Sequence, residues 1–524
     1  MNKENLTAYE VVTEENLTDI HSTGWLLRHK KTGARVMLIE NDDENKVFNI
    51  AFRTPPKDST GVAHILEHSV LCGSREFPLK DPFVELVKGS LNTFLNAMTY
   101  PDKTCYPVAS CNDKDFQNLM HVYLDAVFYP NIYKREEIFR QEGWNYHLEQ
   151  KEGPLKYNGV VYNEMKGAFS SPDEVLEREI MNHLFPDTTY GCESGGDPKN
   201  IPDLTYENFL NFHRTYYHPS NSYIYLYGNM DMEEKLAFLD EHYLSHFDYL
   251  DVDSVIQEQK AFGACRDVTL EYPVAENEGE EDNTYLSYNM VVGNAADSQM
   301  AMAFEVLDYA LLSAPGAPLK QALLDVKAGK DVYGSYDDGI LQPYFTVIAK
   351  GSNPDRKEEF VSVIRQVLGD IVKNGIDKKA VEAGINYFEF RYREADFSSY
   401  PKGLMYSLDI LGDWLYEKGN PFAQVQQLTV FENLKKAVNE GYFEELIRKY
   451  LLENPHGCIM TLIPKKGLAA QREKELEEKL EAYRSSLSEE QLDAMVEKTK
   501  ALEAYQEAGE DPKALGTNLS HTSG

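Results

Sequence analysis

The chain has 524 residues, a hydrophobic fraction of 42% and a formal net charge of −34. This length exceeds what one hydrophobic core can fill, so we predict at least two globular domains. The acidic charge argues against nucleic-acid binding, which needs clustered lysine and arginine. It would attract a basic peptide, although the same charge also serves simply to keep a protein dissolved.

Other features of the sequence concern its compartment. No apolar stretch reaches the length of a membrane span, so we predict no membrane contact. The first five residues, MNKEN, lack the apolar core of a secretory signal and the arginine-rich character of a transit peptide. The six cysteines include no C-x-x-C pair and indicate reduced thiols. Together these features predict a cytoplasmic protein.

The first elements of the chain are predicted to be antiparallel strands followed by a short helix. Residues 24–54 alternate apolar and polar side chains around two turn sequences, which is typical of two or three strands. The run from Gly61 to Leu71 then contains His64, Glu67 and His68 in the pattern H-x-x-E-H. In a helix these three side chains share one face, because residues three and four apart are neighbours.

This helix face has the residue types of a zinc site. Two neutral imidazoles are good zinc ligands, a third ligand would come from elsewhere, and water would take the fourth position. Glu67 would stand beside that water as its general base. The order H-x-x-E-H is the inverzincin signature. Two alternatives are a chance match among the 13 histidines and a structural zinc helix, which would need a fourth protein ligand.

The rest of the first half alternates helices and short strands. The predicted elements are a capped helix, a strand-like run, an amphipathic helix, a further helix, a strand and a last helix, at 83–88, 94–108, 114–128, 173–184, 223–227 and 233–247. The acidic stretch 248–258 then predicts a domain end and linker.

The second half repeats this order of elements. Predicted strands at 267–273 and 284–292 precede a helix that aligns with the first motif when His64 is placed on Glu305, 241 positions later. His68 then falls on Tyr309, so this copy cannot bind zinc. A strand at 458–463 takes the place of the one at 223–227. The pattern predicts a duplicated α+β unit, although chance similarity remains an alternative for any single segment.

The C-terminal region differs in composition. Residues 467–513 contain two charged helices joined near Ser488, which forms a capping box with Gln491, and we predict a largely solvated helical hairpin. Residues 514–524 are small and polar and predict a disordered tail. The two predicted domains before them are a motif-bearing domain at 1–258 and a related domain without metal ligands at 259–466.

Four stretches of the chain resemble the pitrilysin or insulinase family of zinc peptidases, most closely its presequence-protease branch. They are the motif at 64–68, FPLKDPF at 77–83, LNTFLNAMTYPDKTCYPV at 91–108 and GVVYNEMKG at 159–167. Long blocks in the right order are more specific than the five-letter motif. The resemblance implies an α+β fold of two tandem homologous α/β-roll domains of metallohydrolase type, each an antiparallel sheet flanked by helices.

The resemblance also implies a complete metal set. Glu164 matches the family's third zinc ligand and lies 96 positions after His68. One Zn²⁺ per chain would then be held by His64, His68 and Glu164, with Glu67 as the base. The implied activity is hydrolysis of unfolded peptides of limited length.

A substrate-binding segment follows from the same resemblance. Phe94 to Met98 matches an edge strand that pairs with an extended peptide, and Asn96 and Ala97 would lie nearest the substrate backbone. An internal strand is the alternative for this segment.

The length departs from the family pattern, in which members of this branch are about twice as long. Their second half closes over the peptide and supplies an arginine and a tyrosine to the active site. The resemblance here covers the N-terminal half, so two functions stay open. The chain is either a zinc endopeptidase or a catalytically incomplete half that binds zinc and peptide and needs a complementary C-terminal half as its partner.

Overall fold

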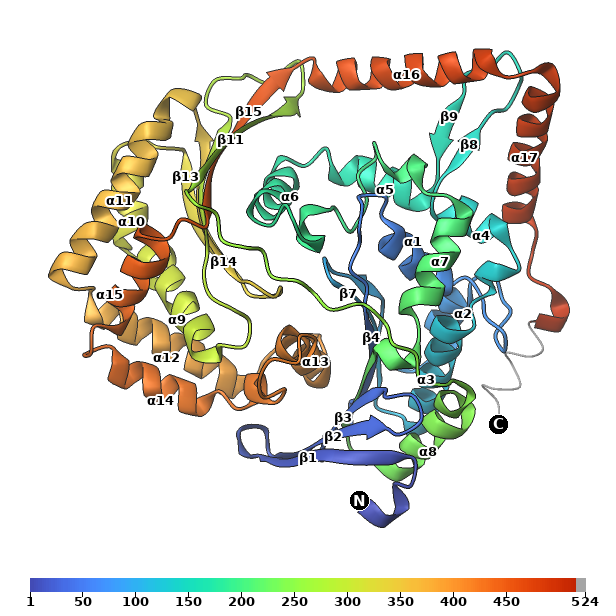
Figure 1. Cartoon of the computed structure of the whole chain (residues 1–524), viewed down its shortest axis with the longest axis horizontal. Helices are drawn as coiled ribbons and strands as arrows, with labels where there is room; N and C mark the ends of the chain where they lie inside the picture. The colour runs from blue at the N-terminus through green and yellow to red at the C-terminus, as the bar shows by residue number, and fades with distance from the viewer. Residues whose placement is uncertain (515–524) are drawn as a thin grey trace.

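The computed structural model describes residues 1–514. Over that range the strands form an eight-stranded sheet, a five-stranded sheet and a two-stranded hairpin. Figure 1 shows the two larger sheets facing each other, with most helices on their outer sides. This arrangement confirms the predicted α+β fold of two related units. The predicted disordered tail, apart from Ala514, lies outside the described residues.

The first sheet has the strand order β1-β2-β3-β10-β4-β7-β5, with β6 also paired to β7. Its strands are β1 (Tyr9–Leu17), β2 (Ser22–His29), β3 (Arg35–Glu40), β4 (Lys46–Arg53), β5 (Asn92–Leu95), β6 (Met98–Thr99), β7 (Lys103–Ser110) and β10 (Ser222–Gly228). The helices of this half are α1 (Val62–Val70), α2 (Pro82–Gly89), α3 (Asp113–Phe128), α4 (Glu136–Glu142), α5 (Val160–Ala168), α6 (Pro172–Leu184), α7 (Tyr206–Tyr216) and α8 (Met232–His242). A separate hairpin pairs β8 (Asn145–His147) with β9 (Lys156–Asn158).

The second sheet has the order β11-β15-β12-β14-β13. Its strands are β11 (Arg266–Val274), β12 (Thr284–Val291), β13 (Asp331–Asp337), β14 (Tyr344–Ser352) and β15 (Gly457–Lys466). Its helices are α9 (Ser298–Asp308), α10 (Pro318–Asp325), α11 (Lys357–Asn374), α12 (Lys378–Glu394), α13 (Lys402–Trp414), α14 (Leu428–Ala437) and α15 (Tyr442–Leu446).

Each sheet contains one parallel pair of strands, which the prediction of antiparallel sheets did not include. Strand β10 lies parallel to β3 and antiparallel to β4, and β15 lies parallel to β11 and antiparallel to β12. Both strands return after long helical connections, and such connections allow a strand to run parallel to an earlier neighbour. The late strand therefore occupies the same place in both sheets, as the internal repeat predicted.

The first sheet is covered on both faces. One face packs against α1, α3 and their neighbours, and the other contributes to a core shared with α13 and the second sheet. Strands β4, β7 and β10 are buried along their whole length, including polar positions. Helix α13 lies between the two sheets in the middle of Figure 1. The second unit is thus joined to the first by a continuous apolar interface.

The two predicted C-terminal helices are present as α16 (Leu468–Ser486) and α17 (Glu489–Glu507), and Ser488 and Gln491 form the predicted capping box. They do not pack side by side as a hairpin. Figure 1 shows them meeting at a corner, with α16 along the top and α17 along the right edge. Their apolar residues pack instead on the β8–β9 hairpin region, through a small core of Leu148, Leu155, Leu480, Leu492 and Val496.

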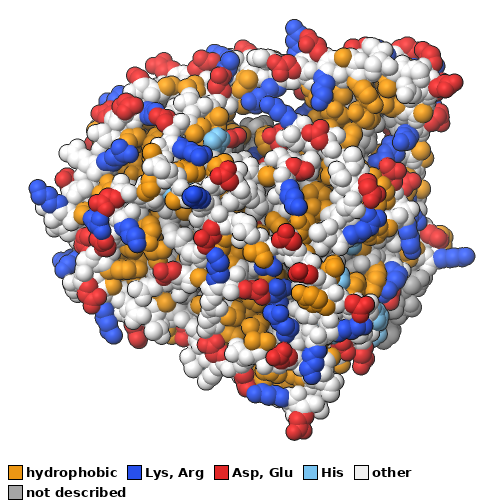
Figure 2. Space-filling view, viewed as in Figure 1, with side chains coloured by type: hydrophobic (Ala, Val, Ile, Leu, Met, Phe, Trp, Pro, Cys, Tyr) orange, Lys and Arg blue, Asp and Glu red, His pale blue; other side chains and the backbone are white. Residues whose placement is uncertain are grey.

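The described surface is charged and mixed. Figure 2 shows acidic and basic side chains interspersed over the viewed face. None of the helices within residues 1–514 combines the length and apolar character needed to cross a membrane. All six cysteines are free thiols, as their spacing predicted.

The small core under α17 leads to a stability prediction. Replacing the buried Leu492 with Ala should weaken the seating of α17 by about 2–4 kcal/mol, because it removes buried methyl groups and leaves a cavity. We expect faster limited proteolysis within α16 and α17, with little change in the thermal unfolding of the two sheets. The exposed Glu490→Ala on the same helix is the control. Equal cleavage rates in both variants would contradict the role of Leu492.

Candidate metal centre and peptide-binding edge

Helix α1 holds the motif with one face buried in the core of the first unit. Ile65, Leu66 and Val70 are fully buried against the sheet and its other helices. The opposite face therefore presents His64, Glu67 and His68, and their ligand atoms all lie within 4.8 Å of one another. The amphipathic packing of the helix is what points the three polar side chains in one direction.

A close backbone contact fixes the start of α1 and the orientation of His64. Gly61 precedes the helix with a φ of +72°, and a Cβ there would lie 2.8 Å from the Gly195 carbonyl oxygen. The Nδ1–H of His64 donates a hydrogen bond of 2.9 Å to the same carbonyl oxygen. Because a carbonyl can only accept, Nδ1 carries the proton and Nε2 presents its lone pair.

Glu164 approaches this lone pair from α5. Its Oε1 lies 3.6 Å from His64 Nε2, and its Oε2 lies 3.6 Å from His68 Nε2. Gly159 allows α5 to begin here, because a Cβ at that position would lie only 2.2 Å from the Gly143 carbonyl oxygen. The structure thus brings the sequence-distant Glu164 to both histidines of the motif.

This donor set fits a zinc ion. Atoms bound at 2.0–2.2 Å in a tetrahedron are about 3.4 Å apart, close to the spacing of Glu164 and the two imidazoles. Burial, followed by the neighbouring His64, lowers the pKa of His68 to about 4. The His68 imidazole is therefore neutral at pH 7, which is the form that binds metal.

Glu67 lies beside His64, His68 and Glu164 but is not placed as a fourth metal ligand. The hydroxyl of Thr99 on β6 donates a 3.1 Å hydrogen bond to Glu67 Oε1, while Oε2 lies 3.5 Å from His68 Nε2. Burial raises the pKa of Glu67 to about 8; the hydrogen bond from Thr99 opposes this shift, and the charge of Glu164 adds to it. A divalent cation at the site would favour the ionised carboxylate, which is the form a general base requires.

The candidate peptide-binding segment lies at the edge of the first sheet. Strand β5 ends the strand order, and both β5 and β6 pair with β7. The predicted continuous strand from Phe94 to Met98 is interrupted at Asn96 and Ala97. The Asn96 side-chain oxygen accepts a 2.9 Å hydrogen bond from the Ala97 N–H. The backbone carbonyl of Asn96 accepts a hydrogen bond from the Tyr123 hydroxyl. The strand pairing along this edge therefore stops at Asn96 and Ala97 and resumes in the same register at Met98, beside the motif helix.

Sequence reasoning missed two residues that orient the site. Gly195 acts through its backbone carbonyl and Thr99 through its hydroxyl. Thr99 lies within the 91–108 block that carries the family resemblance, so the block held a signal for it. Gly195 had none, because any residue offers a carbonyl.

The counterpart of α1 in the second unit is α9. Glu305 and Tyr309 take the places of the two histidines, and Glu305 has its pKa raised to about 8 by burial, Asp338 and Asp308. The carboxyl groups of Glu305 and Asp308 and the phenol of Tyr309 stand where the first unit has His64, Glu67 and His68, so α9 lacks the two imidazoles. The candidate metal-binding face therefore belongs to the first unit.

Comparison with known proteins matches this division. A model described as Insulinase (Peptidase family M16) matches residues 52–191, which include the motif and Glu164. A model described as Peptidase M16 inactive domain matches residues 203–388, and a third model, for a region associated with peptidases of this family, matches residues 462–517. The chain belongs to the insulinase, or M16, family of peptidases, in its presequence-protease branch.

Relatives of this chain include Protein HypA of Clostridium perfringens, which is 51% identical over 95% of this chain and 51% of its own length. Presequence protease 1 of Arabidopsis thaliana, chloroplastic/mitochondrial, is 42% identical over 97% of this chain and 48% of its own length. The chain therefore spans about half the length of these curated relatives.

A solved structure shares the fold at low sequence identity. The first half of the periplasmic protease PqqL from Escherichia coli covers 94% of this chain and 98% of its own, with a TM-score of 0.60 and 14% identity. This likeness shows that the two chains share a fold over nearly their whole lengths.

The raised pKa of Glu305 makes a prediction about pH. The folded state binds this proton more tightly than the unfolded chain, so its burial costs stability as the pH rises from about 4.5 to about 8. Glu305→Gln should be more stable than wild type at pH 8, by roughly 2–4 kcal/mol, and nearly equal at pH 4.5. Urea unfolding at both pH values measures this. The exposed Glu382→Gln on α12 is the control, and a pH-independent difference would refute the assignment.

Proposed function

We propose that the chain binds one Zn²⁺ and forms the catalytic part of a metalloendopeptidase that acts on unfolded peptides of limited length. The observation that carries the proposal is the convergence of His64, His68 and Glu164, with Glu67 beside them. The family match and the names of the presequence-protease relatives support a peptide substrate.

The residues of the site have two roles in this proposal, metal binding and proton transfer. His64, His68 and Glu164 would hold the zinc, which when bound supplies a Lewis acid that polarises a carbonyl and acidifies a water molecule. Glu67 accepts the proton of that water and returns it to the leaving amine. Thr99 occupies one oxygen of Glu67, so the other oxygen faces the metal side and is available for this transfer.

The sheet edge supplies the peptide-binding surface in this proposal. A substrate strand would lie along β5 and β6, near Asn96 and Ala97, and pair with free backbone groups by strand addition. Only an extended segment can pair in this way, which selects unfolded peptides. Helix α1 contacts β6, so a peptide at this edge lies next to Glu67.

A second candidate function is a catalytically incomplete half that needs a complementary half. Two observations favour it: the chain spans about half of its curated relatives, and the Glu164 side chain is 52% exposed. A metal centre open to solvent on one side leaves room for a further protein surface to complete it.

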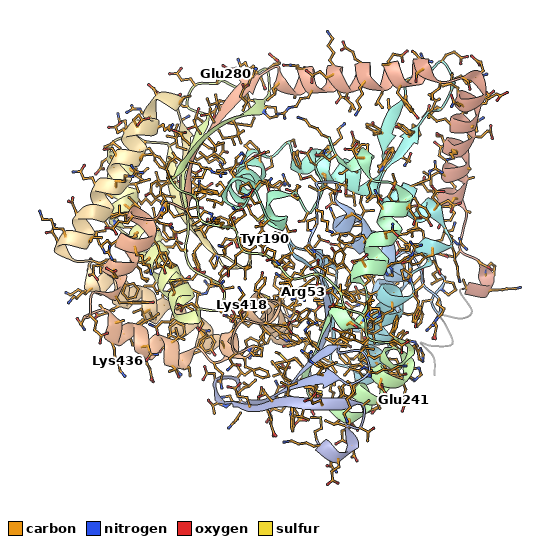
Figure 3. The ribbon with its side chains drawn as sticks, viewed as in Figure 1. Arg53, Tyr190, Glu241, Glu280, Lys418 and Lys436 are labelled. Carbon is orange, nitrogen blue, oxygen red and sulfur yellow. The ribbon has the colours of Figure 1, made fainter. Side chains whose placement is uncertain are left out.

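The base assignment makes a direct prediction. Glu67→Gln should keep bound zinc, because Glu67 is not a ligand, and should lower peptide hydrolysis by at least about 10²-fold, because no group takes the water proton. Metal content by mass spectrometry and cleavage of a fluorogenic peptide measure the two effects. The exposed Glu241→Gln on α8, whose position Figure 3 labels, is the control. Retained turnover in the Glu67 variant would refute the assignment.

A chelator experiment separates the two candidate functions. If the chain is an enzyme by itself, purified protein with one zinc should cleave a fluorogenic peptide, and a chelator should abolish cleavage until zinc is restored. Zinc binding without cleavage would support the incomplete half. A zinc-free preparation that cleaves at the full rate would contradict the metal centre itself.

A further inference from the structure

Asp102 is a fully buried carboxylate between the two units. Its Oδ2 accepts a 2.6 Å hydrogen bond from the Tyr190 hydroxyl and a second hydrogen bond from the Tyr416 hydroxyl. Tyr416 belongs to the second unit and lies just after the end of α13. The Lys103 ammonium lies 3.4 Å from its Oδ1. Burial and the charge of Asp102 raise the pKa of both tyrosines, so both hydroxyls stay protonated and donate.

The same interface ties the neighbouring groups together. The Tyr190 oxygen also accepts a 3.0 Å hydrogen bond from the backbone N–H of Leu341, and Lys103 Nζ donates to the carbonyl of Gly339. Both of these backbone groups belong to the second unit. Figure 3 labels Tyr190 close to the centre of the molecule, between the two sheets. The second unit therefore forms hydrogen bonds to Asp102, to Lys103 and to Tyr190, the partner of Asp102.

The turn that contains Asp102 leads directly to the catalytic base of the proposed function. The 99–103 turn runs from the last residue of β6 to the first residue of β7, and the Tyr100 N–H donates a 2.8 Å hydrogen bond to the Lys103 carbonyl. The Asp102 carbonyl accepts from the Thr54 N–H at 3.0 Å. Thr99, three residues before Asp102, holds Glu67. A displacement of the turn would therefore move Thr99 and change the position of the Glu67 carboxyl group.

We propose that Asp102 and Tyr416 are positioning residues, through which the metal-free second unit holds Glu67 in place for proton transfer. Loss of one donor leaves a buried carboxylate incompletely paired, and the turn must relax to compensate. The inference rests on the proposed function for its catalytic consequence. The mechanical link between Tyr416 and the 99–103 turn stands independently of catalysis.

The test compares two tyrosine variants of the full chain. Tyr416→Phe removes the donor to Asp102. Tyr225→Phe removes another buried hydrogen bond at the same interface, from the Tyr225 hydroxyl to the Gly403 carbonyl on α13. Neither of these two groups is a partner of Asp102 or Thr99 in the hydrogen bonds described above. The two changes are equal in size and chemistry, so they separate a specific link from a general weakening of the interface.

Hydrogen exchange measured on peptides covering residues 99–103 should be faster in Tyr416→Phe and unchanged in Tyr225→Phe. Bound zinc should remain at wild-type level in both. In the peptide assay, kcat should fall about tenfold in Tyr416→Phe with little change in KM, because proton transfer is sensitive to small misplacements. Equal exchange in the two variants, or an equal fall in kcat, would overturn the proposal. A wild-type chain that binds zinc but cleaves nothing counts against the proposed function, while the exchange comparison still decides the link.

Discussion

The packing of one face of helix α1 into the core of the first unit is the constraint on which the site depends. A helix with buried Ile65, Leu66 and Val70 has only one orientation available, and its remaining face must carry the two imidazoles and Glu67. The site is therefore an outcome of hydrophobic burial. The polar side chains of α1 keep their positions because the apolar side chains of the same helix are fixed in the core.

Burial also creates the electrostatic character of the centre. A carboxyl group removed from water and placed near Glu164 favours its protonated form, and a neighbouring imidazole removed from water favours its neutral form. Neutral histidines are the form that binds a cation, and a cation bound beside them would favour the ionised form of Glu67. The protonation states that burial favours are thus compatible with the proposed metal site.

The second unit has the corresponding strand arrangement without the two histidines, and its contacts show what it contributes to the first unit. Its sheet and α13 cover the inner face of the first sheet, which allows β4, β7 and β10 to be buried throughout. Through Tyr416 it also reaches the turn that follows β6. The second unit therefore contacts the elements around the candidate metal centre through packing and through one buried hydrogen-bond network.

Local periodicity was enough to predict the motif helix, the repeated order of strands and helices, and the capping box at Ser488, because each depends on residues near one another in the chain. Glu164 came only from family resemblance, since no spacing rule links it to the motif. The sequence by itself determined which residue types can bind zinc and transfer a proton. Only the tertiary structure decided that Gly195 and Thr99 orient them, that Asn96 interrupts the edge strand, that the last two helices diverge and that β10 enters parallel to β3. These features arise from contacts between segments far apart in the chain, whose energies depend on packing that local pattern does not encode.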